Sequence, residues 1–164
     1  YGSLGLLMMP RGHGKSTILD IYNAWKLFCN SDHLILHQGA TDPDAYKVSR
    51  GTEQVLERHP LCQLFNIKKE RGETQKWWVT GSTDVRHGSI HARGILSNVT
   101  GARANEIQND DVEVPSNIGT PEAREKLRYR LSEQTHILIP GGQKLFVGTP
   151  HTHDSLYTLI QNSK

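Results

Sequence analysis

The sequence predicts an α/β domain in which a mainly parallel sheet carries helices on both faces. Two observations lead to this fold class. Extended and helical patterns alternate along the first part of the chain, and a glycine-rich turn joins the first extended segment to the first helix. Such alternation is typical of parallel sheets, because each crossover between parallel strands carries a helix onto one face. The length of 164 residues suits a single domain of this class.

The composition fits a folded domain and excludes some functional classes. Hydrophobic residues make up 35% of the chain, which is enough to form a core. The longest apolar run, residues 4–10, is too short to cross a bilayer, so we expect no membrane partner. The net charge is only +2, so any contact with DNA must come from local patches. Cys29 and Cys62 form no CxxC pair, which fits a reducing cytosol.

The first half of the chain predicts two strands, each followed by a helix. Residues 4–9 form an apolar run typical of a buried strand, and residues 33–37 form a second one. Between them, apolar side chains recur with helical spacing, and we expect this face of the helix to pack against the sheet. The face consists of Ile18, Ile21, Tyr22, Trp25 and Phe28.

A second helix is predicted after the strand at 33–37. Asp42 is a favourable N-cap, and Pro43 suits the first helical position. The helix should therefore begin there and reach about Arg58, shortly before Pro60.

The second half predicts a less regular part of the sheet. Residues 68–71 are interpreted as a charged turn, and the segments 77–80 and 89–95 are expected to pair as antiparallel strands. A further strand should precede Asp110, although its polar residues would not identify it by propensity alone. Three more elements are expected, namely a helix from Thr120 to about Thr135, a strand at 145–147 and a helix at 154–161.

The turn after the first strand carries the first chemical motif. Residues 9–16 read Met-Pro-Arg-Gly-His-Gly-Lys-Ser and end in the Gly-Lys-Ser of a phosphate-binding loop, the Walker A motif. Its glycines let backbone N–H groups surround phosphate oxygens, Lys15 reaches the β and γ phosphates, and the Ser16 hydroxyl can bind Mg²⁺. The alternative is a glycine-rich turn that only starts a helix. The flanking strand and helix favour the phosphate loop, although Met9 stands where the consensus has glycine.

A site that hydrolyses a nucleotide also needs carboxylates at the end of a neighbouring strand. One holds Mg²⁺, and a second orients or deprotonates the attacking water. Asp110, Asp111 and Glu113 are the candidates for this Walker B position. An acidic surface turn is the alternative for these residues taken alone, and the presence of a phosphate loop favours the catalytic interpretation.

Five short motifs follow one another along the chain. They are Pro-Arg-Gly-His-Gly-Lys-Ser-Thr at 10–17, Thr-Gly-Ala-Arg at 100–103, Asp-Asp-Val-Glu-Val-Pro-Ser-Asn at 110–117, Ala-Arg-Glu-Lys-Leu at 123–127 and Gly-Thr-Pro-His-Thr at 148–152. Their identity and order resemble the large terminase subunits of tailed bacteriophages, in particular those of the short-tailed podophage type. The resemblance extends over nearly the whole chain. It implies a P-loop NTPase of the ASCE type that hydrolyses ATP to pump viral DNA into a procapsid.

The resemblance implies a role for each residue of the nucleotide site. Asp110 and Ser16 would hold Mg²⁺, Asp111 occupies the place of the family's catalytic acidic residue, and Glu113 is the reserve candidate. Lys15, together with Arg11, which resembles an arginine that the family places early in this loop, would neutralise charge on the transferred phosphoryl group. The residues expected to bind ATP are Pro10, Arg11, Gly12, His13, Gly14, Lys15, Ser16 and Thr17.

Two further assignments follow from the resemblance. Gly148, Thr149 and Pro150 resemble the coupling motif that senses the γ-phosphate and passes hydrolysis on to DNA movement; a plain turn is the alternative. Arg103 is a candidate interfacial arginine that would act on the nucleotide of a neighbouring subunit. A surface arginine at a strand end is the alternative for that residue.

The resemblance also implies partners and a location. The partners would be double-stranded DNA, the portal protein, the small terminase subunit and further copies in a homo-oligomeric ring, in the host cytoplasm and transiently at the procapsid portal. Residues 1–164 would be the ATPase domain without the extreme N-terminus and the C-terminal nuclease domain, so we expect this chain not to cut DNA. Two other functions stay open: a phosphotransferase of the nucleotide-kinase type, with residues 68–71 as a lid, and a nucleotide-binding module without hydrolysis.

Overall fold

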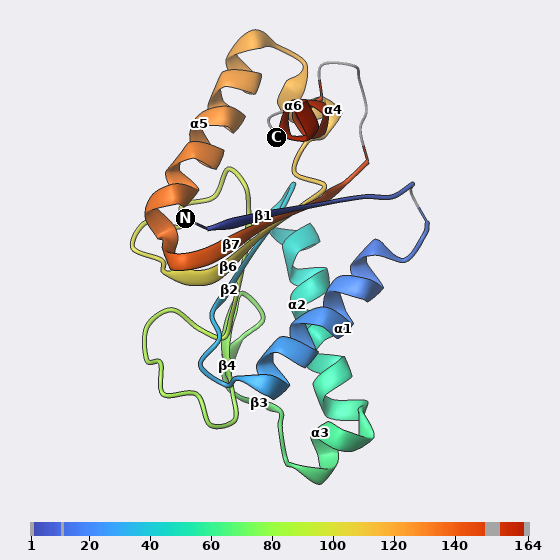
Figure 1. The fold of residues 1–164 in the computed structure, drawn as a ribbon, viewed down its shortest axis with the longest axis vertical. Helices are drawn as coiled ribbons and strands as arrows, with labels where there is room; N and C mark the ends of the chain where they lie inside the picture. Colours follow the sequence, from blue (N-terminus) through green and yellow to red (C-terminus); the bar gives the residue numbers. More distant parts are fainter. Residues whose placement is uncertain (1, 11, 150–154, 163–164) are drawn as a thin grey trace.

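A seven-stranded sheet forms the centre of the computed structural model, which describes residues 2–10, 12–149 and 155–162 (Figure 1). Within these residues, no helix has the length and apolar character needed to span a membrane. The strands are β1 (Ser3–Met8), β2 (Ile35–Gly39), β3 (Lys69–Glu73), β4 (Lys76–Val79), β5 (Ile90–Gly94), β6 (Ala104–Asp110) and β7 (Leu138–Gly148). The helices are α1 (Lys15–Cys29), α2 (Asp42–Arg58), α3 (Pro60–Leu64), α4 (Pro115–Ile118), α5 (Pro121–Ile137) and α6 (Leu156–Asn162).

The strands lie in the order β1-β7-β6-β2-β5-β4-β3. From β1 to β5 in this order, neighbouring strands run parallel, whereas β4 runs antiparallel to both β5 and β3. Helices α1, α2 and α3 lie on one side of the sheet, and α4, α5 and α6 lie on the other (Figure 1). The predicted fold class is confirmed, and so is the antiparallel pairing between the segments 77–80 and 89–95.

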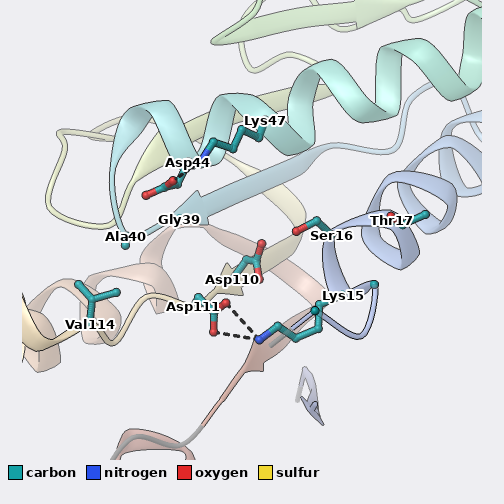
Figure 2. Close-up of a pocket in the computed structure, with 12 residues that line it drawn as sticks. Lys15, Ser16, Thr17, Gly39, Ala40, Asp44, Lys47, Asp110, Asp111 and Val114 are labelled. Atoms are coloured by element: carbon teal, nitrogen blue, oxygen red, sulfur yellow. Dashed lines mark hydrogen bonds and ion pairs between the residues drawn. The ribbon is translucent and has the colours of Figure 1, made fainter. Parts of the chain in front are cut away.

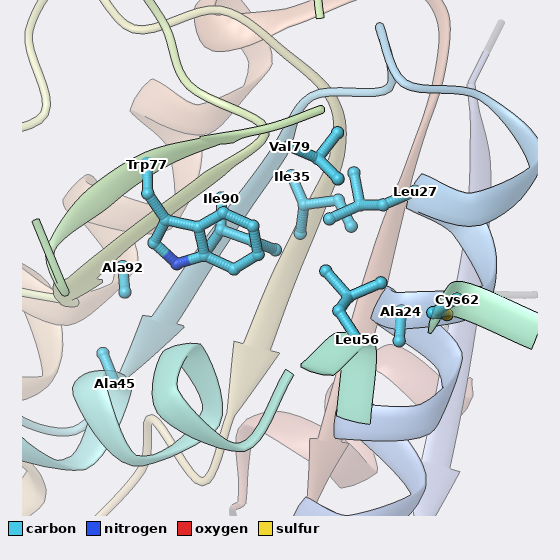
Figure 3. Close-up of a cluster of buried hydrophobic side chains, with 10 residues drawn as sticks. All are labelled: Ala24, Leu27, Ile35, Ala45, Leu56, Cys62, Trp77, Val79, Ile90 and Ala92. Carbon is cyan, nitrogen blue, oxygen red and sulfur yellow. The ribbon is translucent and has the colours of Figure 1, made fainter. Parts of the chain in front are cut away.

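Apolar side chains are buried on both faces of the sheet. On one face, Trp77 of β4 packs with Leu27 of α1 and Leu56 of α2 (Figure 3). The Trp77 indole N–H donates a hydrogen bond to Ser49 Oγ at 2.9 Å, which satisfies its polar group inside the core. On the other face, α5 and α6 cover β7. Because both faces are covered, the edge formed by the carboxyl ends of the parallel strands is where a ligand can reach the sheet.

The packing face predicted for the first helix is wrong for three of its five residues, whereas Phe28 packs against the core and Tyr22 is half-buried. Ile18, Ile21 and Trp25 are 44%, 55% and 56% exposed, although they have the spacing of a buried stripe. The helix instead buries a neighbouring face, whose members are Lys15, Leu19, Asn23, Ala24 and Leu27. Hydrogen bonds explain why a polar residue lies on that face. Asn23 donates to Thr52 Oγ1 at 3.3 Å and accepts from Gln108 Nε2 at 2.6 Å, so its burial leaves no unsatisfied amide.

Two local predictions also differ from the structure. Residues 68–71 do not form a turn, because β3 begins at Lys69 and pairs with β4 as the outermost strand, where charged side chains stay in water. The second helix is capped by Thr41 rather than Asp42, since the Thr41 hydroxyl accepts from the backbone N–H of Asp44. Asp42 instead accepts hydrogen bonds from the backbone N–H of Gly94 at 2.6 Å and from Ser97 Oγ at 2.8 Å.

The polar strand expected before Asp110 is present as β6, between β7 and β2. Its side chains Glu106, Gln108 and Asn109 are buried and hydrogen-bonded, and they lie on both faces of the sheet. Glu106 accepts from Tyr22 Oη at 2.9 Å on the α1 side, whereas Asn109 exchanges hydrogen bonds with Gln134 of α5 on the opposite side. These contacts stabilise a strand whose composition alone would not predict one, and the strand ends at Asp110.

Candidate active site

A cavity of about 620 Å³ opens at the carboxyl edge of the sheet (Figure 2). Segments that follow β1, β2 and β6 form its walls, which is where parallel α/β sheets place their ligands. Its lining residues are Gly12, Gly14, Lys15, Ser16, Thr17, Gly39, Ala40, Asp44, Lys47, Asp110, Asp111 and Val114.

The loop between β1 and α1 has the backbone needed to hold an anion. Gly12 and Gly14 adopt φ angles of 78° and 80°, in the left-handed region that side-chain-bearing residues rarely adopt. Helix α1 begins at Lys15, and no side chain caps its N-terminus. The first backbone N–H groups of a helix have no partner within the helix, so here they are available to phosphate oxygens.

Lys15 connects the loop to two other predicted motifs. Its side chain is only 8% exposed, and its Nζ lies 2.7 Å from Thr149 Oγ1 and 3.1 Å from Asp111 Oδ2. The Thr149 hydroxyl also donates to the carbonyl of Met9 at 2.8 Å. The phosphate loop, the segment after β6 and the segment after β7 therefore meet around one ammonium group.

Asp111 is held in an uncommon conformation beside Lys15. Its φ angle is 45°, which costs free energy in a residue other than glycine. Its backbone N–H donates to the carbonyl of Val147 at 2.8 Å, and its Oδ1 accepts from the backbone N–H of Thr149 at 3.2 Å. These contacts fix the carboxylate at the cavity wall, facing Lys15 (Figure 2).

Asp110 lies deeper and lacks a full set of partners. Its Oδ1 atom is buried and has no hydrogen-bond partner. Burial, and next the nearby negative charge of Asp111, raise the pKa of Asp110 to about 7, although Lys15 acts in the opposite direction. A buried carboxylate of this kind is a ready ligand for a cation, because a cation would replace the solvation that it has lost.

Glu113, the reserve candidate, lies outside the cavity lining. It is 4% exposed, and its Oε2 accepts a hydrogen bond from the backbone N–H of Leu156 at 2.6 Å. Its position therefore ties the segment after β6 to the start of α6. The carboxylates that line the cavity from this segment are those of Asp110 and Asp111.

The remaining predicted residues lie elsewhere, or outside the described part of the chain. Gly148 ends β7 against the ring of Tyr157, where a Cβ atom would collide. Arg103 precedes β6, at the end of that strand opposite Asp110, and its guanidinium donates to the carbonyl of His136 at 3.1 Å. Arg11 and Pro150 lie outside the described residues. Pro10 and His13 belong to the loop but do not line the cavity.

Comparison with known proteins finds similarity in sequence and in fold. No protein-family model matches the chain. The chain is 29% identical over 162 residues to the large terminase subunit of Enterobacteria phage T3, an alignment that covers 97% of the chain and 28% of the T3 protein. The predicted resemblance to large terminase subunits is confirmed. The chain thus spans little more than a quarter of the length of this terminase relative.

Two solved structures share the fold of this chain. The N-terminal domain of the DNA packaging ATPase from bacteriophage phi29 matches with a TM-score of 0.59 and 14% identity, over 98% of this chain and 80% of that one. A mutant form of the large terminase ATPase domain of Thermus phage P74-26 matches with a TM-score of 0.52 and 15% identity, over 92% and 60%. At these identities the likeness establishes the fold, which agrees with the predicted P-loop NTPase class.

The sequence prediction missed the wall of the cavity that follows β2. Gly39 ends β2 and Ala40 follows it, whereas Asp44 and Lys47 belong to the first turns of α2. No motif marks these residues. Because β2 is the neighbour of β6 in the sheet, its carboxyl end must lie beside the carboxylates, so the strand order would have indicated them.

Proposed function

We propose that the chain is the ATP-hydrolysing motor domain of a viral DNA-packaging terminase, which drives DNA translocation into a procapsid. The observation that carries this proposal is that Lys15, which lines the cavity with the phosphate loop and Asp111, contacts both Asp111 and Thr149 through its ammonium group. The strand order brings these three segments to one edge, and the contacts of the buried Lys15 ammonium with both other motifs favour a nucleotide site over a turn that only starts a helix.

The residues of the cavity fit a magnesium ion bound together with ATP. Ser16 offers a hydroxyl and Asp110 a carboxylate whose Oδ1 is unpaired, and both line the cavity. Among the described residues there is no group of three or more His, Cys, Asp or Glu side chains suited to a metal ion. The phosphates would therefore complete the coordination, as is usual for magnesium. When bound, the ion would neutralise charge on the phosphates of ATP.

Side chains of the phosphate loop and of the segment after β6 would then have separate roles in hydrolysis. Lys15 would exchange Asp111 and Thr149 for the β and γ phosphates, so that its charge stabilises the transferred phosphoryl group. That exchange would release the Asp111 carboxylate to orient the attacking water and accept its proton. Arg11, in the phosphate loop, would supply a second positive charge.

Thr149 is suited to pass the state of the nucleotide on to the rest of the protein. It touches Lys15 through its hydroxyl and Asp111 through its backbone N–H, and it directly follows β7. A phosphate that draws Lys15 away would therefore alter the contacts of Thr149. We assign to the segment 148–150 the coupling of hydrolysis to movement of double-stranded DNA, within a homo-oligomeric ring that works with the portal protein and the small terminase subunit in the host cytoplasm.

The phosphotransferase alternative loses its one candidate lid. Residues 68–71 belong largely to β3, which is the strand farthest from β1 in the sheet and hence from the phosphate loop. The module that binds nucleotide without hydrolysis remains a second candidate, because the ion pair with Lys15 occupies Asp111 in this structure.

Phosphate release from ATP tests the proposal. We expect Mg²⁺-dependent turnover by the wild-type chain, with or without DNA, that needs no small-molecule acceptor. Lys15→Ala should abolish turnover, because water cannot replace a positive charge aimed at the phosphates. Turnover that survives in Lys15→Ala, or that appears only with an acceptor, would contradict the assignment, and nucleotide binding without any turnover would identify the non-hydrolysing module.

A further inference from the structure

The wall of the cavity formed by α2 carries charges that the proposed mechanism does not use. Lys47 and Asp44 project from the first turns of α2 and line the cavity across from Ser16 and Asp110 (Figure 2). Of the described lining residues, Lys15 and Lys47 are the cations, against the carboxylates Asp44, Asp110 and Asp111. A polyphosphate entering this cavity would meet three carboxylates and two ammonium groups, so a second lysine that faces it reduces the excess of negative charge.

The strand order places α2 at the far end of a bound phosphate chain. Along the carboxyl edge, the phosphate loop follows β1, Thr149 follows β7, Asp110 ends β6 with Asp111 after it, and α2 follows β2. Phosphates held on the loop and reaching toward the aspartates would therefore point their terminal group toward α2. Lys15 would flank that group on one side and Lys47 on the other.

Lys47 is paired in a way that lets it move. Its Nζ lies 2.9 Å from Asp44 Oδ1, and the two side chains are 68% and 47% exposed. Asp44 is held at the helix start because its Oδ2 accepts from the Thr41 hydroxyl at 2.7 Å. The hydrogen bonds from Lys47 and then from Thr41 keep the pKa of Asp44 below its ordinary value, so it stays charged. An exposed pair of this kind contributes little to stability, and the lysine has the longer and more flexible side chain.

We propose that Lys47 is a second phosphate-binding lysine, which leaves Asp44 for the terminal phosphate and so distinguishes a nucleoside triphosphate from a diphosphate. The inference rests on the proposed function, since it requires the cavity to bind a nucleotide. Asp44 acts as the partner that holds Lys47 at the cavity wall until the terminal phosphate arrives.

Equilibrium binding of two nucleotides tests the inference. The probes are a non-hydrolysable ATP analogue and ADP, each with Mg²⁺, measured on the whole chain by calorimetry. Lys47→Met, which keeps the length of the side chain and removes its charge, should weaken binding of the analogue about tenfold, as expected for the loss of one charge-assisted hydrogen bond. Binding of ADP should change by less than about twofold. Lys47→Arg should restore most of the affinity for the analogue.

Arg130→Met is the matched control. Arg130 pairs with Glu133 at the same i,i+3 spacing and the same 2.9 Å distance, but on α5, across the sheet from α2. The Arg130→Met variant should bind both nucleotides as the wild type does. Thermal unfolding of each variant should confirm that the variant is folded. Equal losses for the analogue and ADP in Lys47→Met, or no loss for either, would overturn the inference.

The same data separate this inference from the proposed function. If Lys15→Ala loses both nucleotides while Lys47→Met keeps both, the nucleotide site stands and the role of Lys47 falls. If the wild-type chain binds neither the analogue nor ADP, the proposed function falls and the inference falls with it.

Discussion

Lys15, Asp110 and Asp111 lie within one cavity, but the structure places the two aspartates in different surroundings. Asp111 faces Lys15 at the cavity wall, whereas Asp110 is half-buried and its Oδ1 atom is buried without a partner. Adjacent residues of the same type can therefore have separate tasks. The sequence predicted that these residues act together, because each belongs to a local motif, but their difference in environment depends on the sheet and could not be predicted.

The first prediction separates the two aspartates by function. Asp111→Asn should keep binding of ATP with Mg²⁺ but lower turnover about 100-fold or more, because the neutral amide cannot accept a proton. Asp110→Asn should weaken the Mg²⁺-dependent part of binding itself. Turnover and equilibrium binding, each measured with and without Mg²⁺, give the comparison. Glu113→Gln is the control, and if it alone binds without hydrolysing, the base has been assigned to the wrong residue.

The second prediction concerns the pH dependence of stability. The pKa of Asp110 is about 7 in the folded protein, against an ordinary value of 3.8. The folded state holds this proton more tightly, so the contribution of the group to stability is complete below pH 3.8 and is lost as pH rises through 7. Asp110→Asn cannot ionise, and it should raise the free energy of unfolding in metal-free buffer at about pH 8 by about 1–3 kcal/mol.

Urea unfolding at about pH 8 and about pH 5 measures this difference. The difference in free energy of unfolding between Asp110→Asn and the wild type should become smaller as the pH falls through about 7. Below that pH the wild-type carboxyl is protonated in the folded state and is therefore neutral, like the amide. A variant that is less stable than the wild type at the higher pH would show that the carboxylate is stabilised in place. Such a result would also weaken the case for Asp110 as a cation ligand.

At the scale of elements, helix α1 was predicted correctly, but most of the face that was expected to pack against the sheet is exposed. The stripe of Ile18, Ile21 and Trp25 has ideal spacing, yet the helix turns Asn23 and Leu27 inward. Periodicity reports where apolar residues lie, but it does not report that a buried amide will find partners on β6 and α2. The burial of polar side chains on β6 has the same explanation. The position of this strand could be predicted only because a strand was expected before Asp110.

The third prediction follows from the orientation of α1. Leu27→Ala should lower the free energy of unfolding by about 2–5 kcal/mol, because it leaves a cavity in the cluster that includes Trp77. Trp25→Ala removes a larger side chain but should change stability by about 1 kcal/mol or less, since that side chain is largely exposed. Chemical unfolding of both variants decides between the two faces. A larger loss in Trp25→Ala would restore the face that the periodicity indicates.

At the scale of the whole molecule, the small net charge limits how the chain can hold DNA. With a net charge of +2, only a few lysine and arginine side chains on any one face can contact phosphates. The fourth prediction is weak, sequence-independent binding that falls about 40-fold between about 50 and 200 mM salt, as expected for about three phosphate contacts. Fluorescence anisotropy with two unrelated duplexes measures it. Tight binding to only one of the duplexes, with an affinity that does not change with salt, would contradict the prediction.

The pairing of β1 with β7 also has a consequence for how the chain is made. Ser3 lies opposite Gln143, and β1 is the end strand of the described sheet, with β7 as its neighbour there. During synthesis, β1 cannot join the sheet in this way until β7 has been made, and such long-range pairing slows folding. A chain that ends at Ile137 should leave the phosphate loop without its supporting strand. Limited proteolysis of stalled nascent chains should accordingly find the segment before α1 cleavable until β7 has left the ribosome.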